Sequence, residues 1–317
     1  MTSQSLAADD LLPDPGPAAG ALQPARYVES DGLQLAVYTW GRHPTAKQPR
    51  PTLLLVHGYP DSADVWSAVA QRLAKRFFVV AYDVRGAGRS TAPRGTQAYA
   101  LKHLVDDLAA VADAISPDSP VHLVGHDWGA LQGWEALLSE RLTGRIASYS
   151  TAAPALDHVR LWFERRARRP TPRNLVEFAS QALGSAYMMA FQVPLLPELA
   201  WKLMLGRNWP RLLARMDGVA TEARPTQCAD GQHGLGLYRA NLLPRLLRPR
   251  PRRTEVPVQL LLMRRDPFVP ARIFECVAEY TPNLRRTEID AGHWAPLSQP
   301  QAFADAVAGF VTTIEKA

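Results

Sequence analysis

Three short apolar runs alternate with helical segments in the first half of the chain. The runs span residues 52–56, 77–82 and 121–124, and the helical patterns span residues 64–75, 98–115 and 128–140. Each run is apolar throughout, not only at every second residue. This pattern is typical of parallel strands that are covered on both faces. The sequence therefore predicts a parallel sheet with helices on both sides.

A long helical insertion interrupts this alternation. Five further strands are predicted, the first two as a hairpin, over residues 27–30, 33–38, 146–152, 256–263 and 284–289. A last helix is predicted over residues 300–315. From Asp157 to about Arg253 the pattern is helical, broken by prolines at positions 170, 172, 194, 197, 210, 225 and 244. We therefore expect an α/β fold with an eight-stranded, mostly parallel sheet and an inserted helical lid.

The expected divisions of the chain follow from this pattern. Residues 1–24 are rich in Ala, Pro, Asp and Gly, and they are expected to form a disordered tail. The core is expected over residues 25–156 and 254–317, and the lid over residues 157–253.

A sharp turn follows the run at residues 121–124. Residues 125–130 read Gly-His-Asp-Trp-Gly-Ala, which is the shape of the G-x-S-x-G nucleophile elbow with Asp127 in the place of serine. Gly125 and Gly129 permit the tight turn, and the following helix N-terminus favours an ionised carboxylate. An ordinary N-cap aspartate is the alternative. As a nucleophile, Asp127 would form an alkyl ester that water must hydrolyse, which indicates epoxide opening or halide displacement.

Two further polar residues follow the last two predicted strands. Asp266 lies in Arg-Asp-Pro, and His293 lies in Ala-Gly-His-Trp. The order nucleophile, acid, histidine is that of α/β-hydrolases. His293 is interpreted as the general base that activates water, and Asp266 as the group that orients its ring.

A fourth polar segment follows the first apolar run and reads His57-Gly58-Tyr59-Pro60. The backbone N–H groups of Tyr59 and Trp128 are predicted to form the oxyanion hole for ester hydrolysis. Pro60 is a candidate for a cis peptide bond. No metal site is predicted, since His122 and His126 have no further ligand near them in the sequence.

The composition bears on where in the cell the protein is expected. Of the 317 residues 47% are hydrophobic, yet no apolar run approaches the length of a membrane span. The N-terminus lacks the features of a secretory signal, and two cysteines, Cys228 and Cys276, fit free thiols in a reducing compartment. A cytoplasmic location is therefore the default expectation.

The positive charge is concentrated in the predicted lid. Residues 157–253 hold 17 Lys and Arg against 7 Asp and Glu, while the whole chain carries +6. No nucleic-acid-binding motif accompanies this charge. Contact with an anionic membrane, through Leu161, Trp162 and Phe163 beside four arginines, is one interpretation, and a solvated face is the other.

These motifs together resemble those of the α/β-hydrolase epoxide hydrolases. The resemblance rests on residues 57–60, on Asp83-Val84-Arg85-Gly86-Ala87-Gly88-Arg89-Ser90, on the elbow and on the late Asp and Gly-His-Trp. It covers the chain from about Tyr27 onward. It is closest to the epoxide-hydrolase-like domain that some actinobacterial proteins carry before a short-chain dehydrogenase-like domain. No such second domain is expected in this chain.

The resemblance also implies residues of the lid. Tyr187 and Tyr238 correspond to the two tyrosines that hydrogen-bond the epoxide oxygen in this family, although Gly236-Leu237 before Tyr238 departs from the usual pattern. Substrate-binding positions are implied at His57, Pro60 and Phe191. No cofactor is implied.

The sequence therefore predicts a hydrolase that converts a lipophilic epoxide to a vicinal diol through an ester on Asp127. A haloalkane dehalogenase shares this nucleophile, but such enzymes usually carry asparagine where Tyr59 stands. A non-catalytic binding protein with the same fold is the third alternative.

Overall fold

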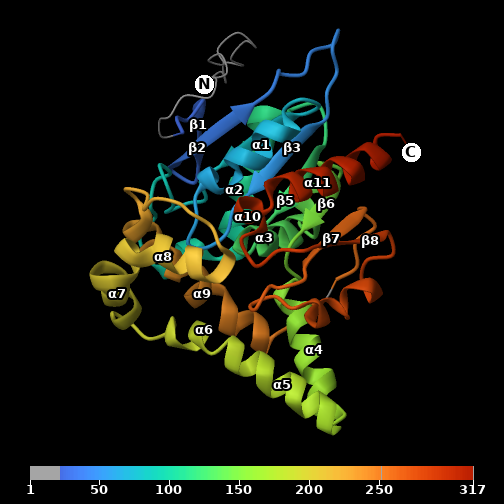
Figure 1. Cartoon of the computed structure of the whole chain (residues 1–317). Helices are drawn as coiled ribbons and strands as arrows, with labels where there is room; N and C mark the ends of the chain where they lie inside the picture. Colours follow the sequence, from blue (N-terminus) through green and yellow to red (C-terminus); the bar gives the residue numbers. More distant parts are fainter. Residues whose placement is uncertain (1–21, 251, 317) are drawn as a thin grey trace.

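The computed structural model describes residues 22–250 and 252–316, and these are organised around one sheet of eight strands (Figure 1). The strands are β1 (Arg26–Ser30), β2 (Leu33–Trp40), β3 (Thr52–Val56), β4 (Phe78–Tyr82), β5 (Val121–Gly125), β6 (Ile146–Thr151), β7 (Val258–Met263) and β8 (Leu284–Ile289). Their spatial order is β1-β2-β4-β3-β5-β6-β7-β8. Only β2 runs antiparallel to its neighbours β1 and β4. The predicted fold class is confirmed.

The strands β3, β4 and β5 bury both of their faces, as their continuous apolar runs predict. Successive side chains of a strand point to opposite faces of the sheet. On β3, Leu54 and Val56 pack into a core with α2 (Leu101–Ile115) and α3 (Trp128–Leu137). Leu53 and Leu55 pack into a second core with α1 (Ser67–Leu73) and α11 (Pro300–Ile314). Two helices therefore cover each face near the centre of the sheet.

Short helical turns precede or join these elements. The predicted helices over residues 64–75 and 98–115 each begin with a 3-10 turn and not with α-helix. The short elements are η2 (Ala63–Trp66), η3 (Thr96–Tyr99), η4 (Glu140–Leu142), η6 (Ala271–Phe274), η7 (Val277–Glu279) and α10 (Ala295–Ser298).

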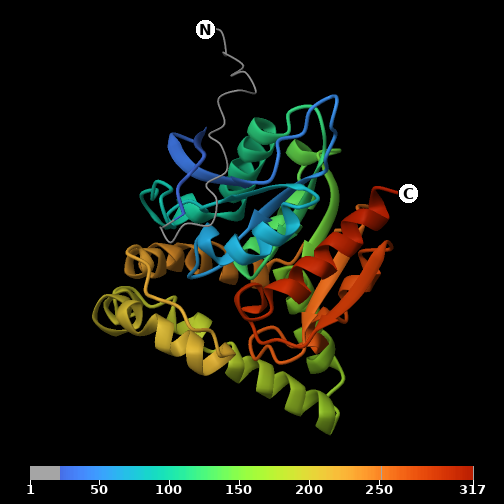
Figure 2. The same cartoon turned by 45° about the horizontal axis from the view of Figure 1, so that its top comes forward.

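The chain between β6 and β7 is mostly helical and lies at the end of the molecule away from β1 and β2 (Figures 1 and 2). We call this segment the inserted helices. It comprises α4 (Leu156–Arg168), α5 (Pro172–Gly184), α6 (Tyr187–Ala190), α7 (Leu196–Ala200), the π-helical turn η5 (Trp201–Leu205), α8 (Gly206–Asp217) and α9 (Gln227–Leu247). Two prolines predicted to break helices, Pro210 and Pro244, lie inside α8 and α9. Pro210 lies in the second turn of α8, shortly after the π-helical turn, and Pro244 lies in the last turn of α9.

The structure removes the basis for a membrane surface around Trp162. This side chain is fully buried, with the Arg166 guanidinium 4.7 Å above its ring. Three of the four neighbouring arginines pair within the chain, in the ion pairs Arg165–Glu279, Arg166–Glu177, Arg166–Glu275 and Arg168–Glu164. The sequence pattern marks α4 as amphipathic, but its apolar side faces the core. No helix among the described residues is long and apolar enough to cross a membrane.

The described part of residues 1–24 begins at Leu22, so most of the expected tail lies outside the described residues. Cys228 and Cys276 are both free thiols, as predicted.

Candidate active site

The strand order brings the predicted site residues to one edge of the sheet. β4 lies on one side of β3 and β5 on the other, so the strand order reverses between β3 and β5. Ligands of open α/β sheets bind outside the carboxyl ends of the strands at such a reversal. The 57–60 loop follows β3, and Asp127 follows β5. Asp266 and His293 follow β7 and β8, at the same edge.

The elbow holds Asp127 in a strained backbone conformation. Its φ of 51° and ψ of −121° lie outside the extended region that an ordinary N-cap residue adopts. Such strain concentrates at functional sites, where the surrounding structure enforces it. Gly129 explains the close packing of the turn, because a Cβ there would collide with the Val56 carbonyl of β3. The N-cap alternative therefore does not describe Asp127.

Backbone N–H groups bind the Asp127 carboxylate. The backbone N–H of Tyr59 donates to Oδ1 over 2.7 Å, and the N–H of Trp128 also donates to this carboxylate. The Tyr59–Pro60 peptide bond is cis, as predicted. The loop approaches so closely that a Cβ on Gly58 would collide with the carboxylate. Both predicted N–H donors thus bind this carboxylate, and that of Tyr59 does so at Oδ1.

His293 lies between two carboxylates. Its Nδ1 is 2.7 Å from Oδ2 of Asp266, and its Nε2 is 3.8 Å from Oδ2 of Asp127. The other Asp266 oxygen accepts the backbone N–H groups of Phe268 and Val269. These bonds fix the Asp266 carboxylate, which in turn orients the imidazole. The structure therefore brings Asp127, Asp266 and His293 together.

Burial and charge set the ionisation of this group. Burial raises the pKa of the Asp127 carboxyl to about 6, although His293 and the two N–H donors oppose it. Burial lowers the pKa of His293, but the Asp266 and Asp127 carboxylates outweigh it and raise that pKa to about 9. The charged His293 keeps the pKa of Asp266 below its usual value despite burial. At neutral pH the resting site holds an ionised Asp127 beside a protonated His293.

The two predicted tyrosines face the elbow from the inserted helices. Tyr187 begins α6, and Tyr238 lies in the middle of α9. Their ring centroids are 6.3 Å apart, and the Tyr238 ring lies 4.8 Å from that of Trp128. The Phe191 ring centroid lies 5.0 Å from that of Tyr238. We call the packed rings of Tyr187, Tyr238 and Phe191 the aromatic wall. Burial, and then the negative charge of Asp127, raise the pKa of the Tyr187 hydroxyl above its ordinary value.

Comparison with known proteins places this arrangement in a family. A family model described as alpha/beta hydrolase fold matches residues 51–300, a range that includes the elbow, Asp266 and His293. This chain belongs to the alpha/beta hydrolase fold family. The match spans the sheet from β3 onward and the inserted helices.

Individual relatives of this alpha/beta hydrolase carry oxidoreductase or epoxide hydrolase names. A Mycobacterium tuberculosis protein named "Probable oxidoreductase EphD" is 37% identical over 297 residues, which cover 91% of this chain and 49% of that protein. The chain thus spans about half the length of this relative. An "Epoxide hydrolase" of Caballeronia sordidicola is 39% identical over 97 residues, covering 30% of this chain and 29% of that protein. The crystal structure of a Bacillus megaterium epoxide hydrolase with an inhibitor superposes with a TM-score of 0.71 at 21% identity, covering 90% of this chain and all of that one.

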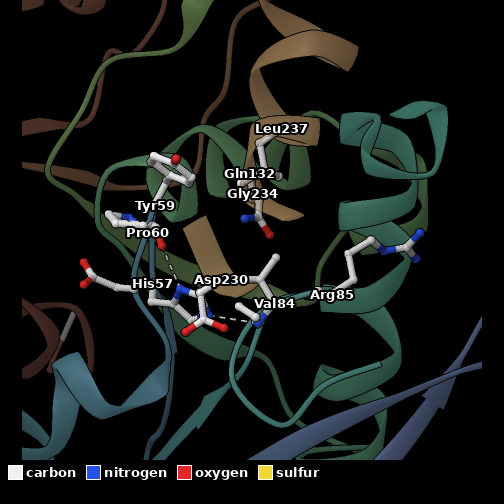
Figure 3. A pocket seen from close by; sticks show the side chains of 13 residues that line it. His57, Tyr59, Pro60, Val84, Arg85, Gln132, Asp230, Gly234 and Leu237 are labelled. Atoms are coloured by element: carbon white, nitrogen blue, oxygen red, sulfur yellow. Dashed lines mark hydrogen bonds between the residues drawn. The ribbon is translucent and has the colours of Figure 1, made fainter. Parts of the chain in front are cut away.

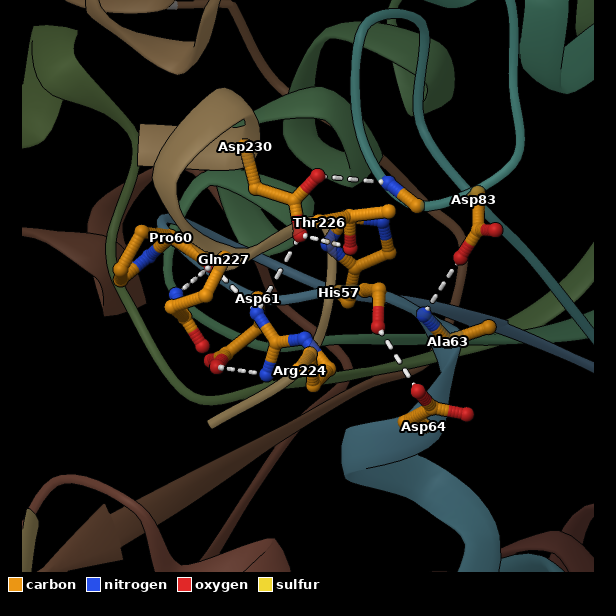
Figure 4. Close-up of polar contacts among 12 residues, drawn as sticks. His57, Pro60, Asp61, Ala63, Asp64, Asp83, Arg224, Thr226, Gln227 and Asp230 are labelled. Carbon is orange, nitrogen blue, oxygen red and sulfur yellow. Dashed lines mark hydrogen bonds and ion pairs between the residues drawn. The ribbon is translucent and has the colours of Figure 1, made fainter. Parts of the chain in front are cut away.

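The inserted helices of this hydrolase also fix the 57–60 loop, through residues that the sequence interpretation missed. The Tyr59 hydroxyl donates to the Gly231 carbonyl over 2.9 Å and accepts the Trp201 indole N–H over 2.5 Å. Arg224 and Gln227 both donate to the Pro60 carbonyl, over 2.7 and 3.0 Å (Figure 4). Pro60 therefore supports the loop through its carbonyl group.

Arg224 is the cation of a buried acidic network. Its guanidinium lies 3.7 Å from Asp61 and 3.5 Å from Asp230 (Figure 4). Asp230 also accepts the backbone N–H of Gly88 over 2.9 Å. Burial raises the pKa of Asp230 to about 6, against the attraction of Arg224. In the sequence Arg224 looks like the other arginines of the inserted segment, and its partner Asp61 lies far away along the chain, so no local pattern marks it.

The predicted role of His57 in substrate binding is not supported by its position. Its Nδ1 lies 2.8 Å from the Gly58 carbonyl, and its Nε2 accepts the Val84 N–H over 2.9 Å. Neither ring nitrogen is left for a substrate. The ring lines a small cavity together with Asp230 and Gln132 (Figure 3). His57 therefore braces the loop that carries the Tyr59 N–H.

Proposed function

We propose that this chain is an epoxide hydrolase that converts a lipophilic epoxide to a vicinal diol through an ester on Asp127. The observation that carries the proposal is an ionised elbow carboxylate close to two tyrosines of the inserted helices, the buried Tyr238 and the half-buried Tyr187. Relatives named epoxide hydrolases support it. We propose further that the inserted helices, which carry both tyrosines, act as the lid of this site. The aromatic wall around Tyr187, Tyr238 and Phe191 supports a lipophilic substrate.

In the first step, Oδ2 of Asp127 attacks an epoxide carbon. Oδ1 is held by Tyr59, so Oδ2 is assigned as the nucleophilic oxygen. The carbon–oxygen bond of the ring breaks, and the oxygen takes a proton from Tyr187 or Tyr238. A hydroxyalkyl ester results, and solvent reprotonates the phenolate. Because burial raises both tyrosine pKa values, the hydroxyls remain protonated donors at neutral pH.

In the second step, water attacks the Asp127 carbonyl carbon. His293 takes a proton from this water, and the negative charge develops on Oδ1 in front of the Tyr59 and Trp128 N–H groups. The ester bond to Oδ2 then breaks, and the leaving alkoxide takes the proton from His293. The diol departs with Oδ2, and the oxygen of water remains in the Asp127 carboxylate.

Ester formation itself prepares His293 to act as a base. In the resting site the Asp127 charge is one of the causes that raise the His293 pKa to about 9. Esterification removes that charge, so the His293 pKa falls toward neutrality. The imidazole then gives up its proton at the stage when the reaction needs a base.

The function is tested by a product screen across epoxides and haloalkanes. We expect diol from aryl or long-chain epoxides, measured by chromatography, and no halide release from simple haloalkanes. Halide release without diol would instead assign a dehalogenase. No turnover of either class over a wide panel would favour a binding protein.

We expect Tyr187→Phe and Tyr238→Phe each to slow ester formation by about tenfold to a hundredfold. Each change removes one hydrogen bond to a developing alkoxide, and bonds to charged groups contribute about 1.5–3 kcal/mol. Stopped-flow quenching of tryptophan fluorescence during a single turnover measures this step. Tyr280→Phe, in a half-exposed tyrosine after η7, is the matched control. Unchanged ester formation in both site variants would remove the tyrosines from the mechanism.

A further inference from the structure

A carboxylate lies at an unfavourable end of one inserted helix. Asp217 is the last residue of α8, and Gly218 follows in the left-handed conformation that ends the helix, with φ 68°. The last turn of a helix carries partial negative charge, so a carboxylate there is destabilising unless something else stabilises it. Departures of this kind from local preference concentrate at functional sites. The partners of Asp217 are therefore informative.

The partners of Asp217 are backbone groups of the His293 loop. Its carboxylate accepts the backbone N–H of Trp294 and also that of His293. A Cβ on the preceding residue, Gly292, would collide with the Asp217 carboxylate in its present position, so glycine leaves room for this contact. One carboxylate from the inserted helices thus binds two consecutive N–H groups of the core loop that carries the proposed base.

Other residues of α8 pack against the core beside this contact. The Trp209 and Trp294 rings pack edge to face, with centroids 5.6 Å apart. Leu213 is buried in the same apolar cluster as Trp294. Asp217 is itself half-buried, which limits screening of its charge by solvent. The position of the His293 backbone is therefore tied to the docking of α8.

We propose that Asp217 is a positioning residue for His293, through which the docked inserted helices support ester hydrolysis but not ester formation. Ester formation uses Asp127 and the tyrosines, none of which Asp217 contacts in this arrangement. Ester hydrolysis uses the ring of His293, whose backbone Asp217 holds. The predicted effect of Asp217 on the two reaction steps rests on the proposed function. Its predicted effect on His293 rests on geometry alone.

The positioning role of Asp217 can be tested through its effect on the His293 pKa. Three carboxylates face the ring from three elements: Asp266 after β7, Asp127 before α3 and Asp217 on α8. His126 also lies beside it, with ring centroids 4.8 Å apart, but burial lowers the His126 pKa to about 3, so it is neutral. Asp217 contributes to the raised His293 pKa. Removing its charge therefore lowers that pKa and extends hydrolysis to lower pH.

The test compares Asp217→Asn, Asp217→Ala and the wild type. Asparagine keeps an accepting oxygen but loses the charge, whereas alanine loses both. Glu222→Gln removes an exposed carboxylate from the same segment and is the matched control. Ester formation and ester hydrolysis are measured separately by rapid quench across pH, and the His293 ring is titrated by NMR in the resting protein.

We expect ester formation within about twofold of wild type in both variants, and hydrolysis slower by about tenfold in Asp217→Ala, the effect of one lost hydrogen bond to a charged group. Asp217→Asn should recover most of that rate at high pH. The His293 titration midpoint should fall by about half a pH unit or more in both variants and not in Glu222→Gln. Equal slowing of the two steps, or an unmoved His293 titration in both variants, would overturn the proposal. If the wild type forms no ester, the proposed function fails, and the titration alone decides the role of Asp217.

Discussion

Asp127→Asn is expected to lose turnover of an aryl epoxide by about 10⁴-fold or more, comparable to removal of a nucleophile from a catalytic triad. The amide has the same shape and still accepts the Tyr59 N–H, but its oxygen is a poor nucleophile. The ester therefore does not form, and its hydrolysis is lost with it. Diol formation followed by chromatography measures the effect.

The control for this variant is Asp118→Asn, which changes an exposed aspartate between α2 and β5. Thermal unfolding should be similar in all three proteins, since the site substitution is isosteric. Equal diol formation by Asp127→Asn and wild type would show that Asp127 is not the nucleophile.

His293→Gln is expected to separate the two steps of the reaction. Ester formation does not need the imidazole, so one equivalent of epoxide should be consumed per site. Hydrolysis should then be slower by about 10⁴-fold, because no base activates water and no acid protonates the alkoxide. Substrate depletion at stoichiometric concentrations measures this burst.

The double variant Asp127→Asn/His293→Gln provides the control for that burst. It should consume no epoxide, since the nucleophile is absent. A burst of the same size in the double variant would assign the consumption to another residue. Multiple turnovers by His293→Gln at the wild-type rate would exclude His293 as the base.

Much of the fold and part of the site follow from local sequence. The three apolar runs predict strands covered on both faces, and Leu53 to Val56 alternate between the two cores as expected. Asp127, Asp266 and His293 each follow a predicted strand, and parallel strands carry their following loops to one edge of a sheet. Their proximity can thus be predicted without knowledge of the inserted helices.

Contacts between the inserted helices and the core are not predictable in this way. Trp201, Arg224 and Asp217 act through partners 70 or more positions away, such as Tyr59, Asp61 and Trp294. In the sequence they look like ordinary residues of solvated amphipathic helices. The same limit explains why the burial of Trp162 could not be predicted. Periodicity shows that α4 has an apolar side, but it does not show what covers that side.

The proposed mechanism depends most on a covalent ester at Asp127. The direct measurement is mass spectrometry of His293→Gln, quenched in acid after one turnover and digested by protease. We predict that the peptide containing Asp127 gains the full mass of the epoxide and that fragmentation places the addition on its carboxylate. An unmodified peptide after stoichiometric conversion of epoxide to diol would contradict the account.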